Sequence, residues 1–156
     1  MRLRDRSGFT LFELLTVIVL MGIVLAVAYP RMSSMATSGS VRTARGAMIT
    51  AVNVAKSSAV TSGKCAYLRL TTSAVTVFTT PCEGGTQITV VSNRNFNTDY
   101  GVTLTLTKGS GSALTSDSLG FDPRGIPLNT TQSSVFTVTK NGVVRTVTVG
   151  NYGRIQ

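Results

Sequence analysis

The chain has 156 residues, enough for one domain with a sizeable core, and its 42% hydrophobic content and mean hydropathy of +0.25 exclude a disordered protein. Its 15 Lys and Arg against 6 Asp and Glu give a net charge of +9, and the absence of histidine excludes histidine-dependent chemistry. The acidic residues are too widely spaced to predict a paired-carboxylate active site or a metal cluster of oxygen ligands. A Ser/Lys dyad stays open in such a serine-rich chain, although no local motif marks one. We therefore expect a structural or binding protein rather than an enzyme, with no catalytic residue, metal or cofactor.

The first predicted element is an apolar helix, and its only charged side chain is Glu13. The run from Phe9 to Tyr29 would extend about 31 Å as a helix, which matches the hydrocarbon core of a bilayer. Three arginines precede this run, namely Arg2, Arg4 and Arg6. By the positive-inside rule they keep the N-terminus in the cytoplasm, so everything after Tyr29 is exported.

Three interpretations of this segment compete, and two of them leave Glu13 unexplained. A secretory signal would have its small-residue cleavage site in the Ala-Val-Ala run at residues 26–28. Its apolar region would then carry Glu13 and Thr16, and a charge at that depth costs about 2.5–3.5 kcal/mol on insertion scales. A plain membrane anchor has the same unpaired carboxylate. In the third interpretation a peptidase cuts after Gly8, and the new amine on Phe9 pairs with the Glu13 carboxylate.

The run Gly-Phe-Thr-Leu-Phe-Glu at residues 8–13, followed by an apolar helix, resembles the prepilin signature of type IV pilins and type II secretion pseudopilins. The resemblance implies that prepilin peptidase removes residues 1–8 as a leader and that the new N-terminal Phe9 is N-methylated. It also implies that Glu13 neutralises the N-terminal amine of a neighbouring subunit in the filament, where each buried charge needs the other. The implied partners are prepilin peptidase, other pilins or pseudopilins, and the bacterial inner membrane. The head domain would be periplasmic before assembly and would belong to a pilus or pseudopilus afterwards.

A second helical segment is predicted at residues 31–62 as a continuation of the first. Apolar residues recur in it at spacings of three and four, which predicts an amphipathic helix packed on a sheet. They are Val41, Ala44, Met48, Val52, Ala55 and Ala59. Polar residues off this stripe are expected to form a solvated face, namely Arg42, Arg45, Asn53 and Lys56. Gly22 and Pro30 lie where pilin helices commonly kink or loosen, and the cluster from Ser33 to Ser40 predicts a bend or a frayed turn.

Beyond Gly63 the hydrophobic period changes to two, which predicts an antiparallel sheet. The expected strands are rich in threonine, valine and aromatic residues and cover residues 65–71, 74–80, 86–92, 101–107, 134–140 and 143–149. Asn141 and Gly142, between the last two, suit a type I′ hairpin turn. The run FDPRGIP at residues 121–127 predicts a short strand that leaves through a proline and glycine turn.

Two cysteines, Cys65 and Cys82, bracket the first predicted hairpin. Export into an oxidising compartment favours a disulfide over two free thiols. Closing a loop of this length would stabilise the fold by about 3 kcal/mol in the chain-entropy model. The spacing has no metal-site signature, and the absence of a C-x-x-C motif argues against a redox role.

These elements predict an α+β fold, with a long N-terminal hydrophobic helix followed by an antiparallel β-sheet head. The expected segments are a leader at 1–8, a membrane or filament-core helix at 9–30, its amphipathic continuation at 31–62 and a β-rich head at 63–156. The run LGFDPRGIP at residues 119–127, the strand pair after it and the terminal GNYGRIQ resemble the GspH/FimT branch of minor pilins and pseudopilins.

That resemblance implies a minor pilin that assembles into, or primes, a type IV pilus. The alternatives are a GspH-like minor pseudopilin of a type II secretion system and a major structural pilin. FimT proteins capture DNA through basic residues near the C-terminus, so double-stranded DNA is a further expected partner, bound through Lys140, Arg145 and Arg154. FimT-type tails carry glycine, arginine, any residue and arginine, and Gln156 stands here in place of the second arginine.

Overall fold

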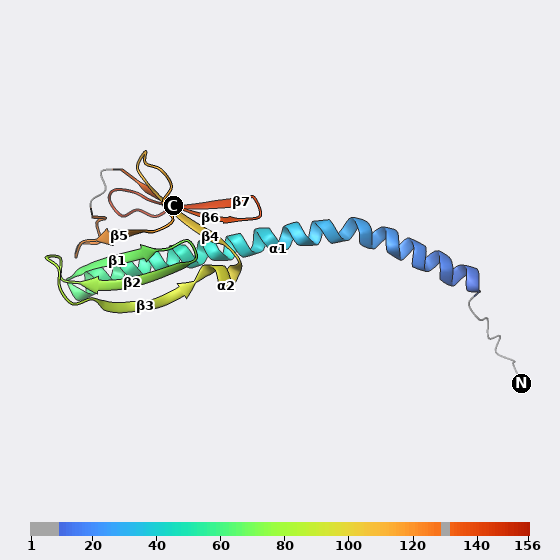
Figure 1. Cartoon of the computed structure of the whole chain (residues 1–156), viewed down its shortest axis with the longest axis horizontal. Coiled ribbons are helices and arrows are strands. Elements are labelled where there is room, and N and C mark those ends of the chain that lie inside the picture. The colour runs from blue at the N-terminus through green and yellow to red at the C-terminus, as the bar shows by residue number, and fades with distance from the viewer. Residues whose placement is uncertain (1–9, 129–131) are drawn as a thin grey trace, which may run out of the picture. The chain divides into compact units, whose positions relative to one another are not determined.

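The computed structural model describes residues 10–128 and 132–156 (Figure 1). In these residues the chain forms two helices, α1 (Leu11–Ser62) and α2 (Phe96–Tyr100). They are accompanied by the strands β1 (Cys65–Leu70), β2 (Ala74–Thr80), β3 (Ile88–Asn95), β4 (Thr103–Lys108), β5 (Asp117–Phe121), β6 (Ser134–Lys140) and β7 (Val143–Val149). The predicted α+β class is confirmed. The chain divides into two compact units, Met1–Ala36 and Thr37–Gln156, and α1 contributes to both.

The first unit contains the beginning of α1, whose side chains are exposed. Leu11 is 84% exposed and Phe12 is 75% exposed, and the large apolar side chains that follow them up to Tyr29 are exposed as well. By length and composition this helix could cross a membrane. The helix begins after Thr10, whose Oγ1 accepts a hydrogen bond from the Glu13 N–H at 3.2 Å.

Helix α1 continues through Gly22, through position 30 and through Ser33–Ser40, so the expected frayed turn in the serine-rich cluster is wrong. Hydroxyl groups in and beside the cluster donate to helix carbonyls instead of competing with the helix. Ser34 Oγ donates to the Arg31 carbonyl at 2.9 Å, and Thr43 Oγ1 donates to the Gly39 carbonyl at 3.0 Å. Such bonds allow serine and threonine to remain in a helix interior.

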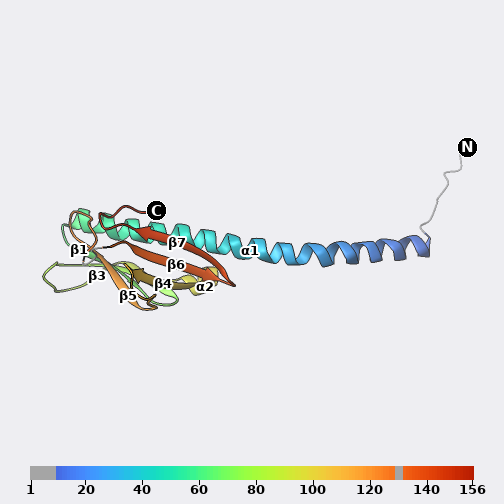
Figure 2. The ribbon, with the colours of Figure 1, turned by 90° about the horizontal axis from the view of Figure 1, so that it is seen from above.

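The second unit has one hydrophobic core between α1 and two antiparallel sheets. One sheet has the strand order β3-β2-β1-β5 and the other the order β4-β6-β7. Figures 1 and 2 both show these strands along the later part of α1. The predicted apolar stripe of α1 is fully buried at Val41, Ala44, Met48, Val52, Ala55 and Ala59. The sheets contribute buried leucine, valine and phenylalanine side chains to the same core, among them Leu68, Leu106, Phe121, Phe136 and Val147.

The terminal hairpin has the predicted turn. Strands β6 and β7 pair from Ser134↔Val149 to Lys140↔Val143. Asn141 and Gly142 between them have φ values of 48° and 79°. Two consecutive residues with positive φ are what a type I′ turn requires, and asparagine followed by glycine is the pair that adopts it at least cost.

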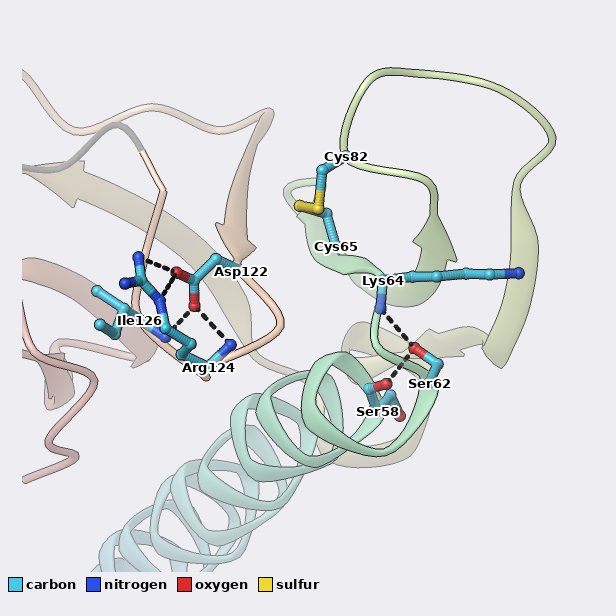
Figure 3. The surroundings of a disulfide bond; sticks show 8 residues. All are labelled: Ser58, Ser62, Lys64, Cys65, Cys82, Asp122, Arg124 and Ile126. Atoms are coloured by element: carbon cyan, nitrogen blue, oxygen red, sulfur yellow. Dashed lines mark hydrogen bonds and ion pairs between the residues drawn. A yellow bond between two sulfur atoms is a disulfide. The ribbon is translucent and has the colours of Figure 1, made fainter.

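The disulfide is also confirmed. Cys65 and Cys82 are bonded, with their Cα atoms 4.9 Å apart (Figure 3). Cys65 begins β1 and pairs with Thr80 of β2, so the bond closes the open end of the β1–β2 hairpin. Cys65 is buried, and the bond therefore lies at the edge of the core.

Two elements differ from the sequence-based expectation. Strand β5 was expected to begin at Phe121, but it ends there, and it pairs with β1 through residues 117–121. Its Gly120 allows a close approach, because a Cβ there would lie 2.8 Å from the Tyr67 ring. Helix α2 was not expected, although its ends carry recognisable signals. Asn95 caps it by accepting from two backbone N–H groups, and Gly101 ends it with a φ of 65°.

Candidate functional site

The first candidate site is the beginning of α1, which contains Glu13, the residue predicted to act in assembly. Glu13 lies in the first turn and is exposed, and its carbonyl accepts a hydrogen bond from Thr16 Oγ1 at 2.8 Å. Among the described residues no cation lies within 4 Å of its carboxylate. Gly8 and Phe9, the predicted cleavage and methylation residues, lie outside the described part of the chain. Within residues 10–128 and 132–156 the Glu13 carboxylate therefore has no ion-pair partner.

The three cations predicted to bind DNA do not form one patch, and Lys140 has a structural role instead. Its Nζ donates to the Tyr100 carbonyl at 2.7 Å and to Ser40 Oγ at 3.2 Å. These two bonds join the turn end of β6 to the end of α2 and to α1. Because this ammonium group is half-buried and already hydrogen-bonded within the head, binding a phosphate would require it to leave both partners.

The C-terminal tail folds back along the end of β7, which the predicted patch required. Thr148 and Gln156 exchange two backbone hydrogen bonds of 2.9 Å, and the Gly150 N–H donates to the Arg154 carbonyl at 2.8 Å. Arg145, however, is five residues before Gly150 on an extended strand, or about 17 Å away. The fold-back therefore places Arg154 at the opposite end of β7 from Arg145.

A glycine contact holds the tail against the head. Gly153 is buried with a φ of 76°, and a Cβ at this position would lie 2.6 Å from the Gly125 carbonyl oxygen. Lys56 Nζ from α1 donates to the Gly153 carbonyl at 3.0 Å. The residues on either side point outward, so that Tyr152 is 82% exposed and Arg154 is exposed beside a shallow cavity of about 340 Å³.

The turn that receives the tail is built on Asp122. Its carboxylate accepts the N–H groups of Arg124 and Ile126, each at 2.9 Å, and pairs with the Arg124 guanidinium at 2.9 Å (Figure 3). Burial raises the pKa of Asp122, but the hydrogen bonds and the Arg124 charge lower it by more, so this pKa lies below its ordinary value of 3.8. The Asp122 carboxyl group is therefore ionised at neutral pH. The two segments that carried the family resemblance, residues 119–127 and 150–156, meet at Gly125 and Gly153.

Replacing Gly153 with alanine should destabilise the head by about 2 kcal/mol, because the new Cβ meets the Gly125 carbonyl and the backbone has a positive φ. Thermal unfolding of the detergent-solubilised protein measures the effect. Gly150→Ala is the matched control, since its Cβ would lie 3.6 Å from the nearest atom, the Arg154 carbonyl oxygen. Equal unfolding temperatures for the two variants would contradict a packed tail.

The third predicted cation, Arg145, lies beside two arginines of α1 that were expected to be solvated. Arg42 and Arg45 line one cleft with Arg145, Val144 and Thr146. Arg45 is not merely solvated, because its Nε donates to the Thr146 carbonyl at 2.8 Å and joins α1 to β7. Sequence reasoning missed this cluster, since α1 and β7 are far apart in the chain. Within the described residues, no three His, Cys, Asp or Glu side chains gather into a metal site.

Comparisons with known proteins match both parts of the chain. The family of the prokaryotic N-terminal methylation motif matches residues 3–29, and the family described as type II transport protein GspH matches residues 44–153. The chain belongs to the GspH family. This match covers most of the chain, including the β-rich head and the Gly153 contact, and the methylation motif covers the predicted cleavage region.

A solved structure shares the GspH-family fold of this chain. It is the crystal structure of the type IV minor pilin FimU from Pseudomonas aeruginosa, with a TM-score of 0.51 and 14% identity over 83% of this chain and 90% of that chain. A second crystal form of FimU gives a TM-score of 0.49 at 15% identity, over 79% and 90% of the two chains. No curated protein sequence matches the chain. The likeness to FimU confirms a long N-terminal helix followed by antiparallel sheets.

Proposed function

We propose that this GspH-family chain is a minor structural subunit of a type IV pilus, cleaved after Gly8, N-methylated at Phe9 and assembled through α1. Before assembly α1 anchors the chain in the bacterial inner membrane, with the head in the periplasm. The observation that carries the proposal is the exposed apolar surface of α1, which contains a single carboxylate at Glu13.

Such a surface needs an apolar environment. Burying one large apolar side chain contributes about 1.5–3 kcal/mol, and α1 exposes a long series of them between Leu11 and Tyr29. Lipid can bury this surface in the membrane, and the α1 helices of neighbouring subunits can bury it in a filament. The methylation motif over residues 3–29 supports the second environment, because it accompanies processing by prepilin peptidase and assembly with other pilins.

The main alternative is a minor pseudopilin of a type II secretion system, which the description of the matched GspH family favours. The fold of FimU, a type IV minor pilin, fits the pilus equally well. A major pilin is the second alternative. Quantitative proteomics of sheared surface filaments separates the three functions. If the chain is a trace component of the filaments it is a minor pilin, and if it is the dominant component it is a major pilin. If it is recovered only with the secretion machinery, it is a pseudopilin.

The mature chain should begin at N-methylated Phe9. Intact-mass spectrometry of the membrane-extracted protein checks this, and a Gly8→Trp variant should keep its leader because a bulky side chain replaces the small residue before the cut. A mature chain that begins at Tyr29 would instead support an ordinary secretory signal and remove the basis for assembly through α1.

A second candidate function is DNA capture, which the exposed pair of Tyr152 and Arg154 favours. Loss of residues 1–8 leaves 12 basic and 5 acidic side chains, a net charge of +7 that attracts polyanions. The arginine can contact phosphate, and the tyrosine can stack on a base at a duplex end or in a single strand.

We expect the head lacking residues 1–30 to bind double-stranded DNA weakly and without sequence preference, and Arg154→Ala to weaken this binding. Because the log–log salt slope is about −0.9 per neutralised phosphate, binding seen at about 50 mM salt should fade near 200 mM. Gel-shift titration measures both effects, with Lys64→Ala as a control of equal charge outside the tail. If the two variants retard DNA equally, the tail is not the site.

A further inference from the structure

Three arginines of the head converge on one cleft between α1 and β7, which we call the arginine cleft. Arg42 and Arg45 lie three residues apart on α1 and therefore on one face of the helix. Arg145 comes from β7, next to Thr146, whose carbonyl accepts the Arg45 Nε–H at 2.8 Å. Together with Val144 these residues line an open cleft of about 490 Å³.

The arginine cleft carries positive charge without a local counterion. In the described residues the ion pairs are Arg94–Asp99, Lys108–Asp117 and Arg124–Asp122, and none involves Arg42, Arg45 or Arg145. Like charges held close together repel, and the bond from Arg45 to β7 keeps one of them in place. An anion in the cleft would relieve this repulsion and would find guanidinium groups able to bind it through paired N–H donors.

The position of the cleft favours a protein carboxylate as that anion. Arg42 and Arg45 follow the exposed apolar part of α1 within about three helical turns of Ala36. In the proposed filament neighbouring subunits cover that apolar part, and the cleft follows it along the same helix. The wall of the cleft also includes Val144, which is 46% exposed. A mixture of arginine and exposed apolar surface is typical of protein interfaces.

We propose that the arginine cleft binds acidic side chains of an adjacent subunit when this chain enters a filament. The inference rests on the proposed function, since it names a partner for the assembled subunit. Glu13 would hold the subunit in the helical core of the filament. The arginine cleft would select a neighbouring subunit whose surface presents Asp or Glu opposite the cleft.

The test uses the full-length chain in its native host. Arg42→Glu combined with Arg145→Glu should reduce the amount recovered in sheared filaments by about tenfold, because reversed charges repel the partner's carboxylates. The Arg42 side chain is exposed and makes no hydrogen bond among the described residues, so its charge reversal should be tolerated by the fold. Lys64→Glu combined with Arg69→Glu is the matched control, because it replaces two cations outside the cleft and changes the net charge by the same amount. Formation of the Cys65–Cys82 disulfide reports on folding of each variant.

A photo-crosslinking amino acid at Val144 identifies the partner. The expected product joins this chain to an Asp- or Glu-containing peptide of another subunit, and reversing that acid to arginine should restore assembly of the double variant. If charge reversal prevents folding, Arg42→Gln with Arg145→Gln should still lower recovery several-fold. Normal incorporation of a folded double variant, or crosslinks to nucleic acid only, would overturn the inference while the proposed function stands. Absence of the wild-type chain from pili and pseudopili would overturn both.

Discussion

Glu13→Ala should leave the chain inserted in the membrane and processed but should lower its incorporation into filaments by at least about a hundredfold. The substitution makes α1 more apolar, so insertion does not suffer. In the proposed filament, however, it would leave the buried amine of a neighbouring subunit without its carboxylate. Removing one member of a buried ion pair costs about 3–5 kcal/mol, and each 1.4 kcal/mol is about a tenfold change in an equilibrium.

Immunoblots of sheared filaments and of membranes measure the two pools of subunit. Thr16→Ala is the control, because it also replaces a polar side chain one turn along α1 and removes only the hydrogen bond to the Glu13 carbonyl. We expect Thr16→Ala to assemble nearly normally. Equal incorporation of Glu13→Ala and wild type would show that the carboxylate has no role in assembly.

Reduction of the disulfide should lower the stability of the head by about 3 kcal/mol, because the unfolded chain regains the freedom of the loop between Cys65 and Cys82. For a domain of this size the loss corresponds to a fall in the unfolding temperature of about 10 °C. Calorimetry of the oxidised and the reduced protein measures this fall in unfolding temperature. Because no residue is replaced, the comparison contains no effect of a changed side chain.

The double variant Cys65→Ala, Cys82→Ala is the control for the reductant. It should unfold near the temperature of the reduced wild type and should not respond to reductant. Quantitative alkylation of both thiols in native, unreduced protein from the periplasm would contradict the bond altogether.

The sequence predicted those parts of the fold that depend on local patterns. The buried stripe of α1 follows from residue spacing, because every third or fourth position faces the same side of a helix. The turn at Asn141 and Gly142 follows from two residues that tolerate positive φ. In both cases the deciding physics lies within a few neighbouring residues, so one sequence is sufficient.

The parts that the sequence did not predict depend on contacts between distant segments. Strand β5 contains Ser118 and Gly120, which are poor strand formers, and it exists because β1 pairs with it. Lys140 and Arg145 lie near each other in the chain but have different partners. Lys140 donates hydrogen bonds to Tyr100 and Ser40. Arg145 lies beside Arg42 and Arg45. The close contact between Gly153 and the Gly125 carbonyl joins residues that are far apart in the chain, so no local pattern indicates it.

The β7 edge of the β4-β6-β7 sheet is partly covered by other segments of the same chain. Strand β7 is an edge strand, and unpaired edges invite strand addition from other molecules. Here the Thr146 carbonyl accepts a hydrogen bond from Arg45, and Thr148 is paired with Gln156, so the later part of that edge is already used within the chain. A strand from another molecule could pair with the full length of β7 only after displacing Arg45 and the C-terminal tail.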